Sequence, residues 1–308
     1  MPYIVARLFG GLGNQLFIYA MARALAVRNG VPLKLDTESG FRNDRTYGRK
    51  YLLDQFNIQD SRASAAESFL FPGGEGVRRV WRKANSMLPL DRRLYLTESA
   101  SRFDPSVFNL RITRPLYLEG YWQTERYFDD QKDLLREELT CTVQPSDQAR
   151  SEVDQILQCK NSVAVGVRRY QEVPDKNYFT ILGPDYYNQA LTHMAAEFEG
   201  VHFFIVSEDI EWCRQTLRVP FPHTFISHKP DDRKAFENLW VAGQCRHFII
   251  SNSSYHWWTA WLASAPDKRV LAPSIGLTNA DWVPKTWEIF APSDEVGRIM
   301  HTQPQTWC

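Results

Sequence analysis

The sequence lacks the features that mark several common classes of protein. It has no apolar run of membrane-spanning length. Its 36 Lys and Arg residues match its 36 Asp and Glu residues, so the formal net charge is +0. A non-specific nucleic-acid binder needs a strongly basic field, and this class is therefore excluded. The chain also begins almost directly in an expected strand, without a signal peptide, which predicts a cytoplasmic protein.

Common metal and phosphate motifs are missing as well. The five cysteines are widely scattered without metal-ligand spacing, which is typical of reduced thiols in a cytosolic protein. A Walker-type glycine loop with a lysine is absent, which argues against phosphoryl transfer from ATP. An Asp-x-Asp triplet that could hold Mg²⁺ is also absent. The sequence therefore predicts no metal ion and no tightly bound cofactor.

What the 308 residues do show is an alternation of strands and helices, which predicts an α/β fold with parallel, doubly wound sheets. The length fits two domains, and the polar segment 142–146 is the expected linker. We therefore place the domains at 1–145 and 146–308. Expected strands cover 3–9, 31–36, 116–123, 163–167, 201–206, 224–226, 247–250 and, as the last, 269–272. Expected helices include 14–29, 124–139 with Thr124 as its N-cap, a helix from Pro184, 210–217, 234–245 and 255–264.

A glycine-rich turn follows the first expected strand. Gly11 and Gly13 lie in this turn and Asn14 begins a helix, where backbone N–H groups can meet an anion or a sugar oxygen. A dinucleotide-binding fingerprint is the alternative interpretation, with Asp36 as the acid that binds a ribose. The third glycine of that fingerprint would fall at Leu16, which counts against it.

Residues 77–88 carry an amphipathic pattern, with apolar residues at helical spacing and basic residues on other faces. Such a helix can rest on an anionic membrane surface. More often it is docked on its own domain with a solvated basic face. We favour the docked helix here, and peripheral contact with the inner face of the plasma membrane is the alternative.

Two adjacent arginines, Arg168 and Arg169, directly follow the buried apolar run 163–167. Consecutive side chains of a strand point to opposite faces, so the pair must lie past the strand's carboxyl end. Open α/β sheets bind their ligands at that edge. Two guanidinium groups there can grip a pyrophosphate through planar, forked donors. A surface turn that happens to hold two arginines is the plain alternative.

Polar residues also follow two other expected strands of the second half. A Ser-Glu-Asp run ends the strand at 201–206, and a Ser-Asn-Ser-Ser turn ends the strand at 247–250. In a parallel sheet these positions converge with the arginines on one edge. Hydroxyl and N–H groups at a helix start suit phosphates, and carboxylates suit a guanine edge or ribose hydroxyls. The combination predicts a nucleotide-diphosphate site that includes Ser207, Glu208, Asp209, Asn252, Ser253 and Ser254.

Four stretches are distinctive together: residues 10–17 (GGLGNQLF), 120–125 (GYWQTE), 206–213 (VSEDIEWC) and 251–261 (SNSSYHWWTAW). With them the sequence resembles the bacterial α-1,2-fucosyltransferases of glycosyltransferase family 11. Residues 165–172 resemble the motif His-x-Arg-Arg-x-Asp, which is shared with α-1,6- and protein O-fucosyltransferases. The sequence departs from this motif twice. Gly166 stands at the histidine position and Gln171 at the aspartate position, with Glu172 next to it.

The resemblance implies a GT-B-like enzyme, with two Rossmann-like domains facing each other across a cleft. GDP-β-L-fucose would bind to the C-terminal domain, and the N-terminal domain would lie on the acceptor side. Transfer would invert the anomeric carbon and would need no metal. The acceptor would be a terminal galactose, fucosylated at O2, in a lipid-linked repeat unit of O-antigen type, as in lipopolysaccharide. The reaction would take place at the cytoplasmic face of the membrane.

Inversion requires a base for the O2 proton and stabilisation of the departing GDP. Arg168 and Arg169 fit the second role, with help from Ser253 and Ser254. For the base, Glu172 is the carboxylate nearest to the motif position.

Other assignments stay open at this point. Asp175 and Glu119 are alternative bases. Asp209 would contact the guanine or the ribose, and Glu208 is the alternate for that contact. A fucosyltransferase of different linkage, a nicotinamide-dependent oxidoreductase and a non-catalytic nucleotide- or glycan-binding protein are the other functions that these residues allow.

Overall fold

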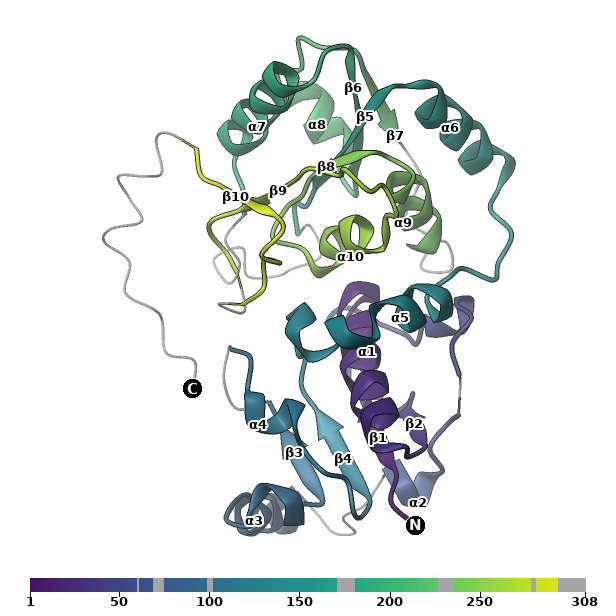
Figure 1. The fold of residues 1–308 in the computed structure, drawn as a ribbon, viewed down its shortest axis with the longest axis vertical. Helices are drawn as coiled ribbons and strands as arrows, with labels where there is room; N and C mark the ends of the chain where they lie inside the picture. Colours follow the sequence, from purple (N-terminus) through teal and green to yellow (C-terminus); the bar gives the residue numbers. More distant parts are fainter. Residues whose placement is uncertain are drawn as a thin grey trace. The chain divides into compact units, whose positions relative to one another are not determined.

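The computed structural model describes residues 1–59, 61–68, 75–98, 102–170, 181–226, 235–277 and 281–292. The chain divides into two compact units. The first contains the described residues of Met1–Gln144 and Thr278–Pro284, and the second contains those of Pro145–Leu277 and Lys285–Cys308. Each unit is built around one sheet (Figure 1).

The first unit holds a four-stranded sheet in the order β2-β1-β4-β3. Its strands are β1 (Ile4–Arg7), β2 (Leu33–Asp36), β3 (Tyr95–Thr97) and β4 (Leu116–Glu119), and all pair in parallel. Helix α1 (Leu12–Asn29) connects β1 to β2 and is buried on most of its sides. Gly30 ends it in the left-handed conformation (φ 63°), as the sequence predicts.

Short helices complete the first unit. They are η1 (Leu53–Gln55), α2 (Ala65–Ser68), α3 (Glu75–Ser86), η2 (Leu90–Arg92), α4 (Pro105–Phe108), η3 (Glu125–Tyr127), η4 (Asp129–Gln131) and α5 (Lys132–Glu138). The single helix expected at 124–139 is therefore wrong, because the chain forms three short pieces there. Phe128 leaves the helical backbone (φ −145°, ψ 5°) and is fully buried. Burial of this ring overrides the local preference for one continuous helix.

The second unit holds a six-stranded sheet in the order β10-β9-β8-β5-β6-β7, again with every pairing between these named strands parallel. The strands are β5 (Asn161–Val167), β6 (Val201–Ser207), β7 (His223–Ile226), β8 (His247–Ile249), β9 (Val270–Pro273) and β10 (Glu288–Phe290). Strand β9 was expected to be the last, and β10 corrects this. Its three residues are too few to show an alternating pattern.

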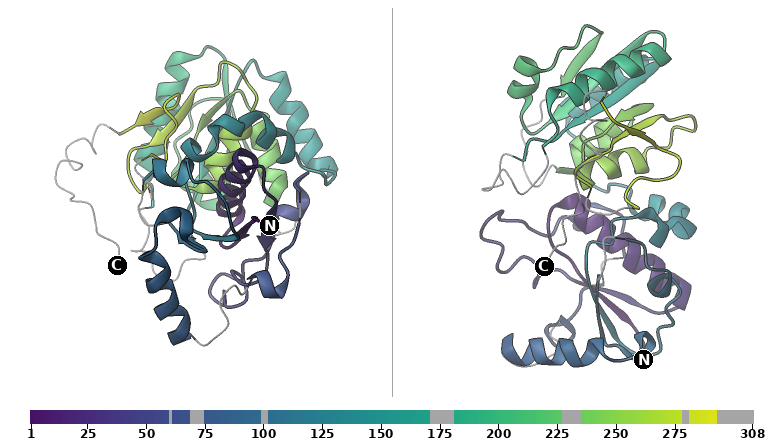
Figure 2. Two further views of the ribbon diagram at one scale, coloured as in Figure 1. Left: turned by 60° about the horizontal axis from the view of Figure 1, so that its bottom comes forward. Right: turned by 90° about the vertical axis from the view of Figure 1, so that its left-hand side faces the viewer.

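Helices cover both faces of the second sheet (Figures 1 and 2). They are α6 (Asp147–Gln158), α7 (Pro184–Glu197), α8 (Ile210–Thr216), α9 (Ala235–Gly243) and α10 (Ser254–Leu262). Val163, Val165 and Val167 of β5 pack with α7 and α8. Residues 164 and 166 point to the opposite face, where α9 and α10 lie. This arrangement confirms a doubly wound parallel sheet.

In each sheet the chain reverses its direction of winding beside a central strand. In the second unit β5 lies between β6 and β8, and in the first unit β1 lies between β2 and β4. Ligands of open α/β sheets bind at such switch points, beyond the carboxyl ends of the strands. The topology therefore points to the loops after β5 and β8, and to those after β1 and β4.

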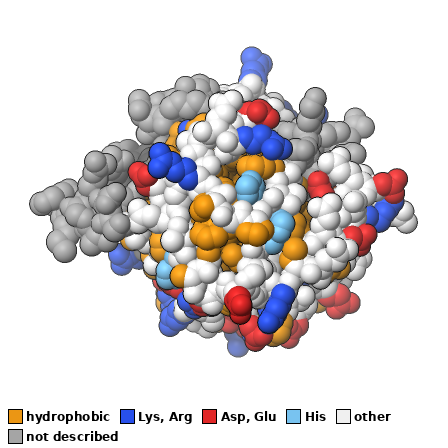
Figure 3. All heavy atoms as spheres, turned by 90° about the horizontal axis from the view of Figure 1, so that it is seen from above, with side chains coloured by type: hydrophobic (Ala, Val, Ile, Leu, Met, Phe, Trp, Pro, Cys, Tyr) orange, Lys and Arg blue, Asp and Glu red, His pale blue; other side chains and the backbone are white. Residues whose placement is uncertain are grey.

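Two surface properties bear on the setting in which the protein works. Seen from above, the molecule shows apolar and histidine side chains near the centre of the face and charges of both signs around them (Figure 3). Among the helices that the structure describes, none is both long enough and apolar enough to cross a membrane.

Candidate active site

Three polar loops meet at the carboxyl edge of the second sheet, as the sequence predicts. Val167 at the end of β5 lies in register with Ser207 at the end of β6. On the other side of β5, Val165 pairs with Ile249 of β8, directly before the turn that contains Ser251–Ser254. The arginine pair therefore lies between the Ser-Glu-Asp run and the Ser-Asn-Ser-Ser turn.

The two arginines diverge to different sides of this edge. Nη1 of Arg168 lies 3.1 Å from Oε1 of Glu208, and its guanidinium lies 4.9 Å from the ring of Tyr170. The guanidinium of Arg169 instead lies 3.9 Å from the ring of Trp212 on α8, and its Nη1 donates to the Leu182 carbonyl at 3.4 Å. Arg168 thus shares its face with Gly166 and α10, whereas Arg169 is held against the α7 and α8 face.

Glu208 fixes the arginine loop rather than standing free for a ligand. Its Oε1 accepts the backbone N–H groups of Arg169 at 2.6 Å and Tyr170 at 2.9 Å, in addition to the contact with Arg168. Tyr170 adopts a left-handed backbone (φ 52°), which is costly for a bulky residue and is maintained by these bonds. The carboxylate therefore sets the direction in which the two guanidinium groups leave the strand.

Tyr170 connects the two sides of the switch point. Its hydroxyl donates to the backbone carbonyl of Asn252 at 3.0 Å, so it ties the loop after β5 to the turn after β8. Tyr170 was not among the site residues predicted from the sequence. Its place directly after the arginine pair is the signal that could have found it.

The Ser-Asn-Ser-Ser turn forms the start of α10. Oγ of Ser253 accepts the Tyr255 N–H at 3.3 Å and caps the helix. Ser251 is fully buried and is hydrogen-bonded to Nδ1 of His256 at 2.7 Å. Nδ2 of Asn252 donates to the Gly276 carbonyl at 3.3 Å. The turn is thus fixed at several points beside Arg168.

Asp209 has a structural task at the same edge. Its Oδ1 accepts the N–H of Trp212 at 3.0 Å and caps α8, and its own N–H donates to Oγ of Ser207 at 3.0 Å. An Asp at the N-cap satisfies an otherwise unpaired N–H of the first helical turn. The contact with guanine or ribose stays a prediction for this residue. Glu172 and its alternative Asp175 lie outside the described residues.

Glu119, another alternative base, is fully engaged in the first unit. Its Oε1 lies 2.9 Å from Nη1 of Arg7, and its Oε2 accepts the Tyr95 hydroxyl and lies 3.6 Å from Nη2 of Arg82. Burial, followed by the contact with Glu119, raises the pKa of Tyr95. A carboxylate held by two arginines and a tyrosine hydroxyl has a structural role and is poorly placed to remove a proton from a substrate.

The glycine turn of the first unit lies at the other switch point. Gly11 immediately precedes α1, and no side chain among the described residues caps that helix end. Gly13 is buried in the first turn, and Oδ1 of Asn14 accepts from Nε2 of Gln123 at 2.9 Å. Gln123 follows β4, so this bond joins the loops after β1 and β4.

Asp36 does not behave as a ribose-binding acid. Its Oδ1 accepts the backbone N–H groups of Glu38 at 3.1 Å and Ser39 at 2.9 Å. Its Oδ2 accepts the hydroxyls of Ser39 and Tyr117, each at 2.6 Å. With only 1% of its surface exposed, this carboxylate is saturated by its own chain. The structure thus removes the acid on which the dinucleotide-binding alternative depends.

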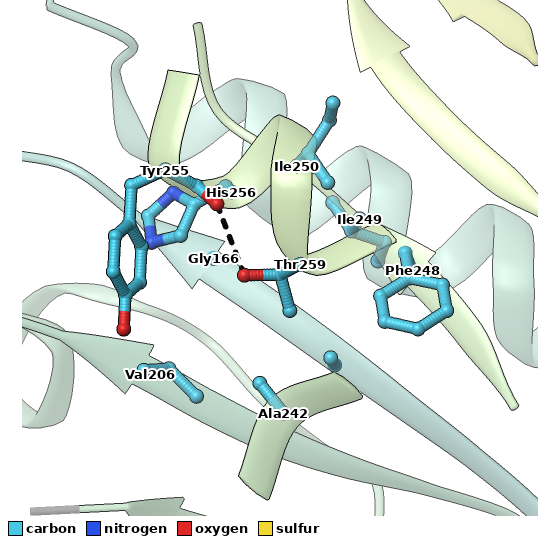
Figure 4. Close-up of a pocket in the computed structure, with 10 residues that line it drawn as sticks. Gly166, Val206, Ala242, Phe248, Ile249, Ile250, Tyr255, His256 and Thr259 are labelled. Carbon is cyan, nitrogen blue, oxygen red and sulfur yellow. Dashed lines mark hydrogen bonds between the residues drawn. The ribbon is translucent and has the colours of Figure 1, made fainter. Parts of the chain in front are cut away.

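A cavity of about 10 Å³ lies below the edge of the second sheet, lined by β5, β8, α9 and α10 (Figure 4). It has room for a single water molecule, so it is too small for a nucleotide or a sugar. Any ligand of the edge must therefore bind outside it. Within the described residues, no group of three or more His, Cys, Asp and Glu side chains could hold a metal ion.

Comparison with known proteins identifies relatives along nearly the whole chain. Residues 98–280 match the model of the family described as Glycosyl transferase family 11. An α-1,2-colitosyltransferase of Escherichia coli is 31% identical over 93% of this chain and 98% of its own length. The O-antigen biosynthesis glycosyltransferase WbnK of E. coli is 26% identical over 86% of this chain and 92% of its own length. The galactoside α-(1,2)-fucosyltransferase 1 of Plecturocebus brunneus is 24% identical over 48% of this chain and 43% of its own length.

Proposed function

Because the chain belongs to glycosyl transferase family 11, we propose that it moves L-fucose from GDP-β-L-fucose to O2 of a terminal galactose. The galactoside α-(1,2)-fucosyltransferase relative supports the sugar and the linkage. The structural observation that most supports this function is the position of Arg168 at the switch point of the second sheet, between Glu208 and the Ser251–Ser254 turn. Two parallel sheets, each with a switch point, support the GT-B-like assignment.

The departing diphosphate is the centre of the proposed chemistry. As the bond to the sugar breaks, negative charge develops on GDP and must be stabilised without a metal ion. Arg168 provides a positive charge on the face of α10, where the hydroxyl of Ser253 and N–H groups of the first turn of α10 also lie. Arg169 is held by Trp212 on the other face. We therefore assign the diphosphate to Arg168 and the anchoring of the loop to Arg169.

Inversion at the anomeric carbon places the acceptor oxygen on the side opposite to GDP. A base must take the O2 proton, and Glu119 is saturated by Arg7, Tyr95 and Arg82. Glu172 keeps this assignment as the carboxylate nearest to the motif position, with Asp175 as its alternative. The acceptor side is assigned to the first unit, where Asn14 and Gln123 meet at its switch point.

Transfer of colitose is the second candidate function. The observation that favours it is the E. coli α-1,2-colitosyltransferase, which is 31% identical over 93% of this chain. Colitose is fucose without the 3-hydroxyl. A site that hydrogen-bonds this hydroxyl rejects the deoxy sugar strongly, whereas a site that leaves it unpaired accepts both. Parallel assays with GDP-fucose and GDP-colitose decide between the two donors.

The proposed setting is O-antigen assembly at the cytoplasmic face of the membrane, on a lipid-linked glycan. The E. coli O-antigen glycosyltransferase relative supports this process.

Helix α3 is the segment proposed for a peripheral contact with the membrane. Trp81 lies against the Tyr95 ring with centroids 6.3 Å apart, and Asn85 bonds the backbone of Leu94 and Tyr95, which fixes the inner side of the helix.

Helix α3 is docked on its own unit through Trp81 and Asn85, as we favoured from the sequence, and its outer side keeps apolar residues exposed. Val77 is 61% and Val80 71% exposed, and Met87 just beyond the helix is 81% exposed. Arg79 and Lys83, which are also exposed, lie beside this apolar strip. Exposed apolar side chains flanked by positive charge suit the surface of an anionic membrane.

Incubation with GDP-fucose and lactose tests the proposed function. A transferase releases GDP and forms a new trisaccharide. A non-catalytic binding protein gives neither product, and a nicotinamide-dependent enzyme consumes no GDP-sugar. Release of GDP without a trisaccharide would limit the activity to hydrolysis and would contradict transfer to galactose.

A further inference from the structure

Gly166 of β5 and His256 of α10 compete for one space. A Cβ atom built on Gly166 would lie 2.5 Å from Cγ of the His256 ring and 2.7 Å from its Cδ2 and Nδ1. Non-bonded Cβ contacts this short essentially never occur, so the ring excludes every other residue type at 166. Figure 4 shows the imidazole lying over Gly166 beside the small cavity.

The ring cannot simply move aside. His256 is 6% exposed, and its Nδ1 is hydrogen-bonded at 2.7 Å to the hydroxyl of Ser251, which is fully buried. Burial, followed by the positive charge of Arg168, lowers the pKa of His256 to about 3. The imidazole is therefore neutral at neutral pH, and its bond to Ser251 fixes the direction of the ring.

This ring lies on the same side of the strand as the proposed diphosphate ligand. Residues two apart in a strand point to the same face, so Gly166 and Arg168 share the side on which α10 packs. Tyr170, two residues after Arg168, donates from its hydroxyl to the Asn252 carbonyl, so the loop that carries Arg168 is tied to the turn that leads into His256. The ring thus packs against the part of the backbone from which Arg168 leaves β5.

The motif that residues 165–172 resemble has its histidine at the position of Gly166. We propose that His256 supplies from α10 the imidazole that this chain lacks on β5, and that it acts as a positioning residue for Arg168 and the diphosphate of the donor. Glycine at 166 and histidine at 256 then form one unit, because the imidazole occupies the space that a side chain at 166 would need. This inference rests on the proposed function for the identity of the donor.

An exchange of the two side chains tests the inference. Gly166→Ala pushes a methyl group into the ring and is expected to lower kcat/KM for GDP-fucose on the order of 10²-fold, as small displacements of catalytic groups do. His256→Ala is expected to cause a loss of similar size. The double variant Gly166→His with His256→Ala returns an imidazole to the same space from the strand side. We expect it to recover at least about tenfold over the worse single variant, a coupling that independent sites do not show.

Two further variants separate positioning from space filling. His256→Phe keeps a ring of similar size without nitrogen atoms, and Ser251→Ala removes the bond that directs the imidazole. His256→Phe should stay folded while kcat falls, and Ser251→Ala should lower kcat and also the thermal midpoint, because it leaves the buried Nδ1 of His256 without a partner. Gly183→Ala is the control, because it adds a methyl group in the same unit at a place where, beyond its two chain neighbours, none of the described residues has an atom within 4 Å. It should behave as wild type.

The readouts distinguish failure of this inference from failure of the proposed function. The dissociation constant for GDP, from titration calorimetry, and the thermal midpoint are measured beside turnover for every variant. Absence of turnover by the wild type with both GDP-sugars would overturn the proposed function. In that case the dissociation constant for GDP would show whether the double variant recovers what the single variants lose. The positioning role is overturned if His256→Phe keeps wild-type kcat/KM and GDP affinity, or if a folded double variant is no better than the worse single variant.

Discussion

An ion pair of 3.1 Å joins Arg168 at the end of β5 to Glu208 at the end of β6. The same carboxylate oxygen accepts the backbone N–H groups of the next two residues along the chain. The end of one strand therefore determines how the loop of its neighbour is oriented. This relationship explains how two consecutive arginines can serve different purposes, one directed to the ligand edge and one to the α8 face.

Arg168→Lys is expected to lower kcat with GDP-fucose on the order of 10²–10³-fold, because lysine keeps the charge but loses the planar fork that can bind Glu208 and a phosphate together. Arg169→Lys should cause a smaller loss through its contact with Trp212. Arg214→Lys, on the surface of α8, is the matched control and should retain wild-type turnover. Circular dichroism checks that the variants are folded. Turnover of both lysine variants within a few-fold of wild type would contradict the diphosphate assignment.

Asp209 allows the helix cap to be separated from donor binding. Asp209→Ala removes the cap of α8 and should lower the free energy of unfolding by about 0.5–2 kcal/mol, and we also expect a raised KM for GDP-fucose with a smaller change in kcat. Asp209→Asn retains a good capping residue and should keep the stability of the wild type. The donor contact predicts that the Asn variant still shows the raised KM. A wild-type donor KM in Asp209→Asn would leave this residue with a capping role alone.

Binding to vesicles tests the exposed strip of α3. The protein should sediment with phosphatidylserine-containing vesicles, and less so with pure phosphatidylcholine or at high salt. Arg79→Gln with Lys83→Gln should weaken this binding about tenfold or more, since each basic residue contributes roughly 1 kcal/mol at an anionic surface. Val80→Asp should weaken it as well. Leu157→Asp, at another exposed apolar position, is the control. Equal sedimentation of all variants would refute a contact through α3.

Acid should destabilise the second unit through its buried histidines. Burial lowers the pKa of His247 to about 4 and that of His256 to about 3, below the usual value near 6.5. Between the lowered pKa values of the folded chain and 6.5, the unfolded chain therefore binds more protons than the folded chain. The free energy of unfolding is at its full value above about pH 6.5 and falls as the pH drops towards 4. Urea midpoints between pH 7 and 5 measure the slope. His247→Asn should reduce it. An unchanged slope in His247→Asn would exclude this cause.

Much of the second unit could be predicted from its sequence because its strands are short, buried and apolar. The runs at 163–167 and 201–206 are almost entirely apolar, so they are expected to be buried. Each run is followed directly by the polar residues of the sheet edge. Their convergence follows from parallel topology alone. The location of Arg168, Ser207 and Ser253 at one edge of the sheet could therefore be predicted from the sequence.

The hydrogen-bond and packing partners of these residues could not be predicted from the sequence. Nothing in the Ser-Glu-Asp run distinguishes Glu208, which clamps the neighbouring loop, from Asp209, which caps a helix, because both roles depend on where two backbone segments meet. The pairing of Gly166 with His256 spans 90 positions of the chain and becomes visible only when α10 packs on β5. Short or broken elements such as β10 and the 125–138 segment were missed because tertiary packing, rather than local preference, forms them.

The product formed from GDP-β-L-fucose and lactose identifies the sugar that is transferred, the hydroxyl that receives it and any need for a metal ion. The reaction is run with EDTA present, and the trisaccharide is analysed by proton NMR. We expect GDP release and a product in which fucose is α-linked to O2 of galactose, at a rate equal to that without EDTA. A β-linked product, attachment at another hydroxyl, or a loss of activity that Mg²⁺ restores would contradict the proposed function.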